Sequence, residues 1–237
     1  MVMENFFNSG EVRLQYLDSG SKRGESLPLL IIPGATENAA DYLSFLDALQ
    51  RRVIVLTMRG RLPSGAPPDG YTLMDHAKDI KALVAHLALQ HFALYAFSRG
   101  VSYALAYAVD HPEGLEALLL VEYPPRHTAL QPEWNERAWA DRWRGKTTPE
   151  RMPRWAIDGM QRDAVARSFA DELPKISCRV LVIGGNPDLG CLLDHEGERL
   201  YLDGLQNVIV HRYAQSGHDV RVPDEKDLIQ QIESFLA

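Results

Sequence analysis

Apolar residues recur along this 237-residue chain in two patterns that alternate with each other. Continuous apolar runs of strand length predict strands, and they occupy residues 27–34, 52–58, 91–98, 115–123, 178–185 and 207–213. Stretches with helical periodicity lie between these runs, at 41–50, after Ser98, at 194–205 and at 223–237. At the amino end, residues 2–7 and 11–17 flank the turn sequence NSG and predict a hairpin.

The strongest helical signal covers residues 72–89. Apolar side chains fall on one stripe of this predicted helix, at Leu73, Ala77, Ile80, Leu83, Val84 and Leu87. Thr72 is placed to accept a hydrogen bond at the helix start, with Asp75 at the third helical position. An amphipathic helix of this kind covers one face of a sheet.

Strands that alternate with helices predict a parallel sheet covered on both faces. We therefore expect an α/β protein with a three-layer α/β/α sandwich and a mostly parallel twisted sheet of about eight strands. Residues 123–175 interrupt the alternation and predict a helical cap or lid inserted into a core made of residues 1–122 and 176–237. Pro132 and Pro149 mark expected helix starts in this insertion.

All four tryptophans lie in the insertion, at Trp134, Trp139, Trp143 and Trp155. Two interpretations stand side by side, because aromatic side chains either line a substrate cavity or pack the insertion onto the sheet. As candidates for substrate binding we name Trp134, Trp139 and Trp143, together with Gly34.

Composition and charge indicate which kinds of partner are not expected. The formal net charge is −7, which argues against nucleic acid, because phosphate binding needs a basic surface. No apolar run is long enough for a transmembrane helix and no signal peptide is visible, so we expect a cytoplasmic protein without a membrane partner. Cys178 and Cys191 form neither a disulfide framework nor a zinc motif, and we expect reduced thiols and no metal. The sequence does not give the oligomeric state.

A serine at the junction of a strand and a helix is the first candidate for chemistry. Ser98 follows the apolar run 91–97 and precedes an alanine-rich helical stretch. A sharp turn there lifts the hydroxyl above the sheet beside the helix N-terminus, and it needs small residues two positions before and two after. Ala96 and Gly100 meet this requirement, giving the motif A-x-S-x-G. A serine that merely caps the helix is the alternative.

A serine nucleophile needs a base and an acid that orients the base. Of the eight histidines, His218 lies in a glycine-containing loop after the last predicted strand, where α/β sheets build their sites. Asp188 follows the penultimate strand and is the favoured acid, while Glu122, after the strand 115–121, is its rival. The oxyanion of the reaction needs backbone donors, for which we expect the amides of Arg99 and of Ala35, next to Gly34.

Taken together, these motifs make the chain resemble an α/β-hydrolase-fold protein of the esterase or lipase type with a small helical cap. The resemblance covers nearly the whole chain, from the run 27–42 to the loop around His218. It implies Ser98 as nucleophile, His218 as base, Asp188 as acid and no cofactor. The chain departs from the usual pattern at Pro33, at Thr57 and at Ala96.

The expected activity is that of a cofactor-free serine hydrolase acting on a carboxylic ester, a lactone or a thioester, with a small molecule as its substrate. A binding protein that keeps the pocket without turnover is the alternative from another class, and a lyase or cofactor-free oxygenase on the same fold is the third. The side chain of Arg99 either remains in solvent or binds an acidic group of the substrate.

Overall fold

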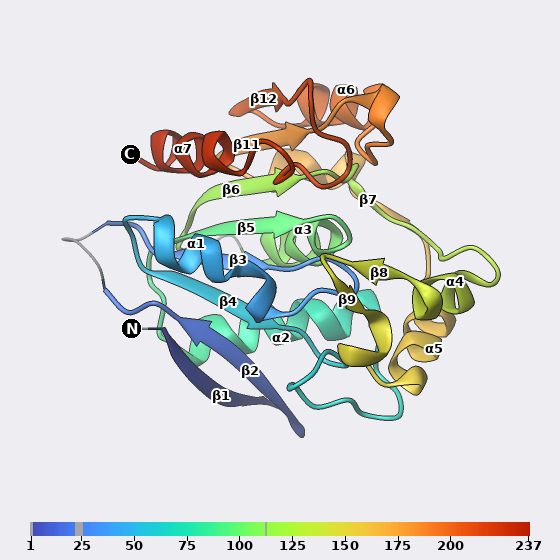
Figure 1. The fold of residues 1–237 in the computed structure, drawn as a ribbon. Coiled ribbons are helices and arrows are strands. Elements are labelled where there is room, and N and C mark those ends of the chain that lie inside the picture. The colour runs from blue at the N-terminus through green and yellow to red at the C-terminus, as the bar shows by residue number, and fades with distance from the viewer. Residues whose placement is uncertain (1, 22–25, 112) are drawn as a thin grey trace.

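A single mixed sheet organises the molecule. The computed structural model describes residues 2–21, 26–111 and 113–237. The eight strands lie in the order β1 (Met3–Ser9), β2 (Val12–Asp18), β4 (Val53–Thr57), β3 (Leu29–Ile32), β5 (Phe92–Phe97), β6 (Leu115–Val121), β11 (Arg179–Gly184) and β12 (Val208–Arg212). Strands β1, β2 and β4 pair antiparallel, and the remaining pairs are parallel (Figure 1). The predicted α/β sandwich with about eight strands is confirmed.

Helices cover both faces of this sheet, because alternate residues of each strand point to opposite sides. One face packs against α2 (Leu73–His86), α3 (Gly100–Asp110) and α6 (His195–Gly204), and the other against α1 (Leu43–Ala48) and α7 (Glu225–Phe235). In β3, Leu30 and Ile32 join the first core while Leu29 and Ile31 join the second. A strand with both faces buried has no polar positions, which explains the continuous apolar runs.

The predicted start of α2 is confirmed. The Thr72 hydroxyl accepts a hydrogen bond from the amide of Asp75 at 3.2 Å, and the Asp75 carboxylate accepts one from the amide of Thr72 at 3.1 Å. This reciprocal cap contributes about 1 kcal/mol to the stability of the helix.

The amino-terminal hairpin is confirmed, but its turn lies later than NSG. Ser9 pairs with Val12, so the turn consists of Gly10 and Glu11, and Gly10 has a φ of 61°. The glycine supplies the left-handed conformation that a two-residue turn needs. Asn8 and Ser9 therefore extend the strand and do not form the turn.

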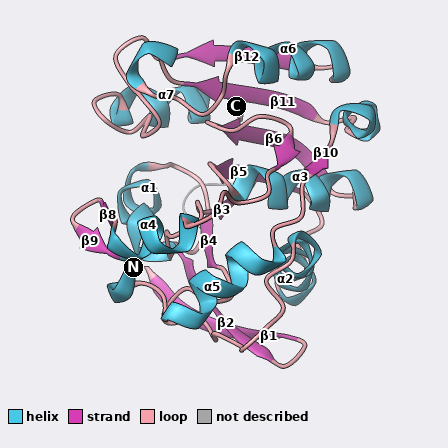
Figure 2. Cartoon of the chain, turned by 90° about the vertical axis from the view of Figure 1, so that its right-hand side faces the viewer, coloured by secondary structure: helices cyan, strands magenta, loops and turns pink. Residues whose placement is uncertain are grey.

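The segment between β6 and β11 contains only short elements. They are β7 (Arg126–His127), α4 (Trp134–Ala140), β8 (Arg142–Trp143), β9 (Lys146–Thr147), η2 (Thr148–Glu150), α5 (Arg154–Asp163), β10 (Arg167–Ser168) and η3 (Ala170–Lys175). Helices α4 and α5 lie at the carboxyl ends of the parallel strands (Figures 1 and 2). Pro149 is the second residue of the 3₁₀ turn η2, one position later than predicted. Pro132 does not begin a helix, because α4 starts at Trp134 after a left-handed Glu133.

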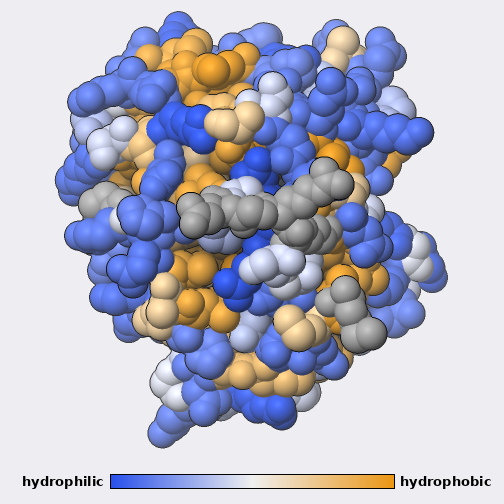
Figure 3. All heavy atoms as spheres, turned by 90° about the vertical axis from the view of Figure 1, so that its left-hand side faces the viewer, coloured by the Kyte–Doolittle hydropathy of each residue, from blue (hydrophilic) through white to orange (hydrophobic). Residues whose placement is uncertain are grey.

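The opposite face, at the amino ends of the parallel strands, mixes hydrophilic and apolar side chains (Figure 3). Among the helices in the described ranges, none has the length and apolar character needed to cross a bilayer.

Candidate active site

Ser98 occupies a strained turn between β5 and α3. Its φ is 52°, a left-handed conformation that is unusual for a residue with a side chain. Its amide donates to the carbonyl of Val121 at 2.8 Å, which ties the turn to β6. A Cβ atom at Gly100 would lie 2.4 Å from the carbonyl oxygen of Pro33, so only glycine fits there. The glycine two positions after Ser98 thus has a steric cause, and the expected turn between strand and helix is present.

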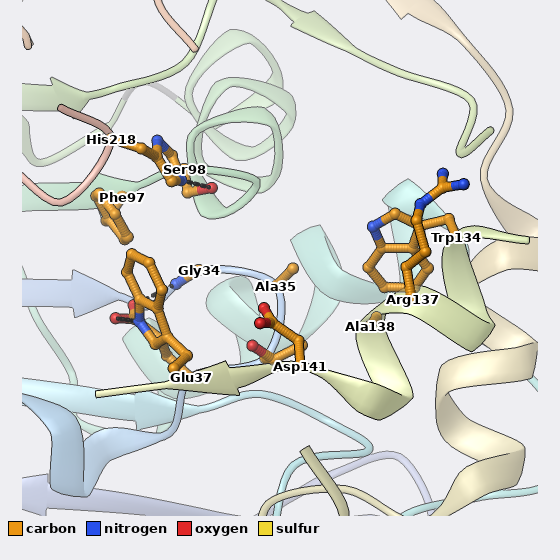
Figure 4. Close-up of a pocket in the computed structure, with 12 residues that line it drawn as sticks. Gly34, Ala35, Glu37, Phe97, Ser98, Trp134, Arg137, Ala138, Asp141 and His218 are labelled. Atoms are coloured by element: carbon orange, nitrogen blue, oxygen red, sulfur yellow. Dashed lines mark hydrogen bonds between the residues drawn. The ribbon is translucent and has the colours of Figure 1, made fainter. Parts of the chain in front are cut away.

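The imidazole of His218 lies against this serine. The loop between β12 and α7 carries His218, and its Nε2 atom is 3.0 Å from the Ser98 hydroxyl oxygen (Figure 4). The ring stacks on Phe97, with ring centroids 5.0 Å apart, and lies 6.0 Å from Trp143. These contacts hold the base in position although its side chain is 24% exposed.

The carboxylate that orients His218 belongs to Glu122. Its Oε2 atom is 3.0 Å from His218 Nδ1, and its side chain is fully buried directly after β6. The amides of Gly185 and Leu192 donate to Glu122 at 2.7 Å and 2.8 Å. With Nδ1–H donating to the carboxylate, Nε2 is free to accept the serine proton.

Asp188, the favoured acid in the sequence analysis, does not hold His218. It lies in the short 3₁₀ turn η4 (Pro187–Leu189), where it is exposed and its amide donates to Asn186 Oδ1 at 3.0 Å. The reason is topological, since β6 pairs directly with both β5 and β11 and therefore ends between the nucleophile and the β11 loop. Glu122 reaches the imidazole from this central position.

Two backbone amides beside Ser98 are available to a ligand. Within the described ranges, the amides of Ala35 and Arg99 donate no hydrogen bond. The neighbouring amide of Gly34 donates to Glu37 at 2.9 Å, and the carbonyl of Ala35 accepts from Arg61 Nε at 2.9 Å. These contacts hold the loop after β3 in place and leave the Ala35 N–H unengaged, as an oxyanion donor requires.

Sequence reasoning missed Glu37, a buried acid that organises this loop. Its carboxylate, 2% exposed, accepts hydrogen bonds from Tyr42, from Trp143 Nε1 at 2.9 Å and from Arg221 at 2.8 Å. Burial, with the neighbouring Glu37 charge second, raises the pKa of Tyr42. An acid three residues after Gly34 was the only visible signal, and such spacing alone does not reveal burial.

A cavity of about 440 Å³ opens above Ser98 and His218. Of the predicted substrate-binding residues, Gly34, Trp134 and Trp143 line it. Arg137, in α4, and Asp141, directly after it, also line this cavity, and in Figure 4 the Asp141 carboxylate lies on the side facing Ala35.

Trp139 is not part of this cavity. It packs against a small apolar cluster formed by Tyr71 and residues of the insertion, with the Arg154 guanidinium 5.6 Å from its ring centroid. Trp155 is 55% exposed and donates to the carbonyl of Ala66. Two of the four tryptophans, Trp134 and Trp143, thus line the cavity beside Ser98, whereas Trp139 and Trp155 lie outside it.

The Arg99 side chain is not in solvent. It is 4% exposed and donates to the carbonyl of Thr128 at 3.1 Å and to Nε2 of His127 at 2.8 Å. Burial, with Arg99 second, lowers the pKa of His127 to about 3, so this imidazole is neutral. Its Nδ1 lies 2.8 Å from the hydroxyl of Ser102.

Over the residues with described positions, no group of three His, Cys, Asp or Glu side chains is arranged to bind a metal ion. Cys178 and Cys191 are free thiols, and burial raises the pKa of Cys178 to about 11.

Comparison with known proteins places this geometry in a family. A family profile described as "alpha/beta hydrolase fold" matches residues 28–220. The chain is 35% identical to a proline iminopeptidase of Lactobacillus acidophilus over 107 residues, which are 42% of this chain and 36% of that relative. It is 29% identical to an N-formylmaleamate deformylase of Pseudomonas putida over 163 residues, 68% of this chain and 54% of the relative. These matches thus span only part of the relatives' length.

A solved structure is similar to this chain over nearly its whole length. The esterase EaEST of Exiguobacterium antarcticum superposes with a TM-score of 0.81 at 18% identity, covering 99% of each chain. At this level of identity the similarity establishes the fold.

Proposed function

Since the chain belongs to the α/β-hydrolase family, we propose that it is a serine hydrolase that cleaves a carboxylic ester, lactone or thioester through an acyl-enzyme on Ser98. One observation carries the proposal: Ser98, His218 and Glu122 form a continuous hydrogen-bonded chain, with 3.0 Å at each step. A nucleophile, its base and an orienting acid in this order constitute the arrangement that activates a serine.

In the acylation step, Ser98 Oγ attacks the carbonyl carbon while His218 Nε2 takes the serine proton. Glu122 stabilises the imidazolium that forms, and two backbone amides of the β11 loop hold its buried carboxylate in place. The amides of Ala35 and Arg99 stabilise the oxyanion. The carbonyl-to-leaving-group bond then breaks, and His218 returns the proton to the leaving heteroatom.

In the deacylation step, His218 removes a proton from a water molecule that attacks the acyl carbon. The ester bond to Ser98 breaks, Oγ recovers its proton from His218, and the carboxylic acid leaves. Every proton in both steps passes through Nε2, so no cofactor is needed in the proposed cycle.

The proposal includes the division of the chain into a core, residues 1–122 and 176–237, and a cap, residues 123–175. The hydrogen bond from Trp143 Nε1 to Glu37, at 2.9 Å, supports the assignment of the insertion as a cap, because it joins the insertion to the loop beside Ser98. A cap in this position limits the entry of water and shapes the substrate cavity.

Covalent labelling tests the nucleophile. We expect a fluorophosphonate probe to modify Ser98, and Ser98→Ala to abolish both the labelling and the hydrolysis of p-nitrophenyl acetate. The control is Ser102→Ala, because Ser102 is close in sequence but fully buried and should leave the labelling in place. Hydrolysis that survives Ser98→Ala contradicts the proposal, and labelling without turnover of any ester supports a binding protein instead.

Amide hydrolysis is the second candidate, supported by the similarity to a proline iminopeptidase. Release of an amino-terminal residue needs an acid that pairs with the substrate ammonium group. Glu37 is already paired with Arg221 at 2.8 Å, which leaves Asp141 on the cavity wall for this role. Turnover of L-proline p-nitroanilide faster than p-nitrophenyl acetate would favour the peptidase.

A further inference from the structure

A second cavity adjoins Ser98 on another side. Its volume is about 290 Å³, and it shares Ala35, Ser98 and Trp134 with the larger cavity. Its walls are mainly apolar and include Tyr123, Pro124, Leu130 and Leu192. The nucleophile thus stands where two compartments meet, as a substrate with two unlike halves would require.

The position of the base decides which half enters which cavity. His218 lines the larger cavity and is not among the residues that line the smaller one. Because His218 Nε2 must protonate the leaving heteroatom, the leaving group has to lie on the His218 side. The acyl group is then directed into the smaller cavity.

The smaller cavity contains an arginine without a counter-ion. Arg99 lines it and is 4% exposed, and within the described ranges it makes no ion pair. Its guanidinium donates to the Thr128 carbonyl and to the neutral His127, while its buried Nε has no hydrogen-bond partner among the described residues. A buried cation is stable when an anion compensates it.

Two neighbouring arginines add to the uncompensated positive charge around Arg99. Arg61 is fully buried, and across the described part of the chain it also makes no ion pair. Burial lowers the pKa of Arg61, and the charge of Arg99 contributes in the same direction. Arg126 lines the smaller cavity, and its contact with Asp194, at 3.5 Å, lies between two exposed side chains. The protein is acidic overall, with a formal charge of −7, yet the two charged residues that line this cavity, Arg99 and Arg126, are both basic.

We propose that the smaller cavity receives the acyl group of the substrate and that this acyl group ends in a carboxylate that pairs with Arg99. The inference rests on the proposed hydrolase function. The substrate class is then a half-ester of a short dicarboxylic acid: Ser98 forms the acyl bond, the alcohol leaves with the proton from His218, and water releases the dicarboxylate.

Matched esters test this in the wild-type protein. Monoethyl succinate and ethyl butanoate have four-carbon acyl groups that differ in the terminal charge, and monoethyl glutarate and ethyl pentanoate form the same pair one carbon longer. With acid release followed by pH-stat titration at pH 8, we expect kcat/KM to be about tenfold or more higher for the charged member of at least one pair. Equal values, or a preference for both uncharged esters, overturn the inference.

Two variants separate charge from space. Arg99→Met keeps the backbone amide and should reduce the ratio of kcat/KM for monoethyl succinate to that for ethyl butanoate to about one or below, whatever its effect on the absolute rates. Arg13→Met, an exposed arginine on β2, is the control and should keep the preference. Leu130→Trp should lower kcat/KM for both four-carbon esters relative to ethyl acetate, whereas Ala129→Trp, at the exposed neighbouring position, should not.

The outcomes separate the two proposals. Hydrolysis of ethyl butanoate without any advantage for monoethyl succinate overturns the inference and leaves the hydrolase intact. Failure to hydrolyse every ester overturns both. Should Arg99→Met not fold, the wild-type ratios and Leu130→Trp still decide the matter, and a chain-length profile that Leu130→Trp leaves unchanged contradicts the acyl assignment.

Discussion

The loops that follow β6 and β11 both carry an acid at the same edge of the sheet, but they contribute differently to the site. The β6 loop supplies the buried carboxylate of Glu122, whose side chain is hydrogen-bonded to His218. The β11 loop supplies backbone N–H groups, from Gly185 and Leu192, while its own acid, Asp188, is exposed. Position after a strand therefore does not identify the orienting acid, whereas burial together with converging donors does.

The two loops also differ in how they are held. Glu122 has a φ of 58°, and its amide donates to the carbonyl of Ile183 in β11 at 2.8 Å. Gly185 passes so close to the His218 loop that an added Cβ would lie 2.2 Å from the carbonyl oxygen of Gly217. Backbone strain at Glu122 and close backbone contact at Gly185 position the same imidazole from two sides.

Removing the Glu122 charge gives the largest expected effect. Glu122→Gln should lower kcat for p-nitrophenyl acetate by roughly 10³–10⁴-fold, because the amide no longer stabilises the imidazolium or fixes its tautomer. Steady-state kinetics measure the loss, and a melting curve verifies that the variant folds. A folded variant that keeps a tenth or more of the activity would remove Glu122 from the proposed mechanism.

A side chain added at Gly185, in the loop after β11, gives the second largest expected effect. Gly185→Ala should lower the free energy of unfolding by about 3 kcal/mol, because the new Cβ collides with the Gly217 backbone. Urea denaturation measures it. Gly190→Ala is the control, with a φ of 78° but no atom within 4 Å of the added Cβ, and should cost about 1 kcal/mol. Equal losses in the two variants would show that the contact with the His218 loop is unimportant.

His127, further along the segment after β6, should make the stability of the protein depend on pH. The pKa of His127 is about 3 in the folded protein, below the usual value of 6.5, so the unfolded chain binds a proton that the folded protein does not. The stability of the folded state therefore falls as the pH drops below 6.5, by about 2 kcal/mol between pH 7.5 and pH 5. Urea denaturation at pH 7.5 and pH 5 measures the free energy of unfolding of the wild type and of His127→Gln. The variant should lose less stability than the wild type between the two pH values, and equal losses would contradict the prediction.

Removing the exposed acid gives the smallest effect. Asp188→Asn should leave kcat/KM for p-nitrophenyl acetate within about twofold of wild type, because surface substitutions away from partners cost little. This variant is the direct counterpart of Glu122→Gln. A loss near that of Glu122→Gln would mean that the β11 loop rearranges during the reaction and that the acids exchange roles.

The sheet and two members of the candidate triad could be predicted from sequence because their signals are local. Continuous apolar runs mark strands buried on both faces, and Gly100 reflects a clash that any side chain would meet at Pro33. His218 follows a recognisable strand in a glycine-containing loop. The choice between Glu122 and Asp188 depended on which strand ends beside the nucleophile and on which backbone amides converge, and neither is encoded in local spacing.

The insertion was the least predictable region. Helix α4 has only seven residues, too few for periodicity to show that Trp134 faces the cavity while Trp139 packs elsewhere. The Arg99 side chain is held by Thr128, 29 residues later. Contacts of this kind arise only when the insertion folds back over the sheet.

The placement of two indole rings gives this protein an optical reporter of its own. Trp134 borders both cavities, and the Trp143 ring lies 6.0 Å from that of His218. Arrival of a ligand would replace water around these rings, and their emission would change without any added dye. Substituting Phe for Trp139 and Trp155, which border neither cavity, would leave a spectrum that follows occupancy in real time.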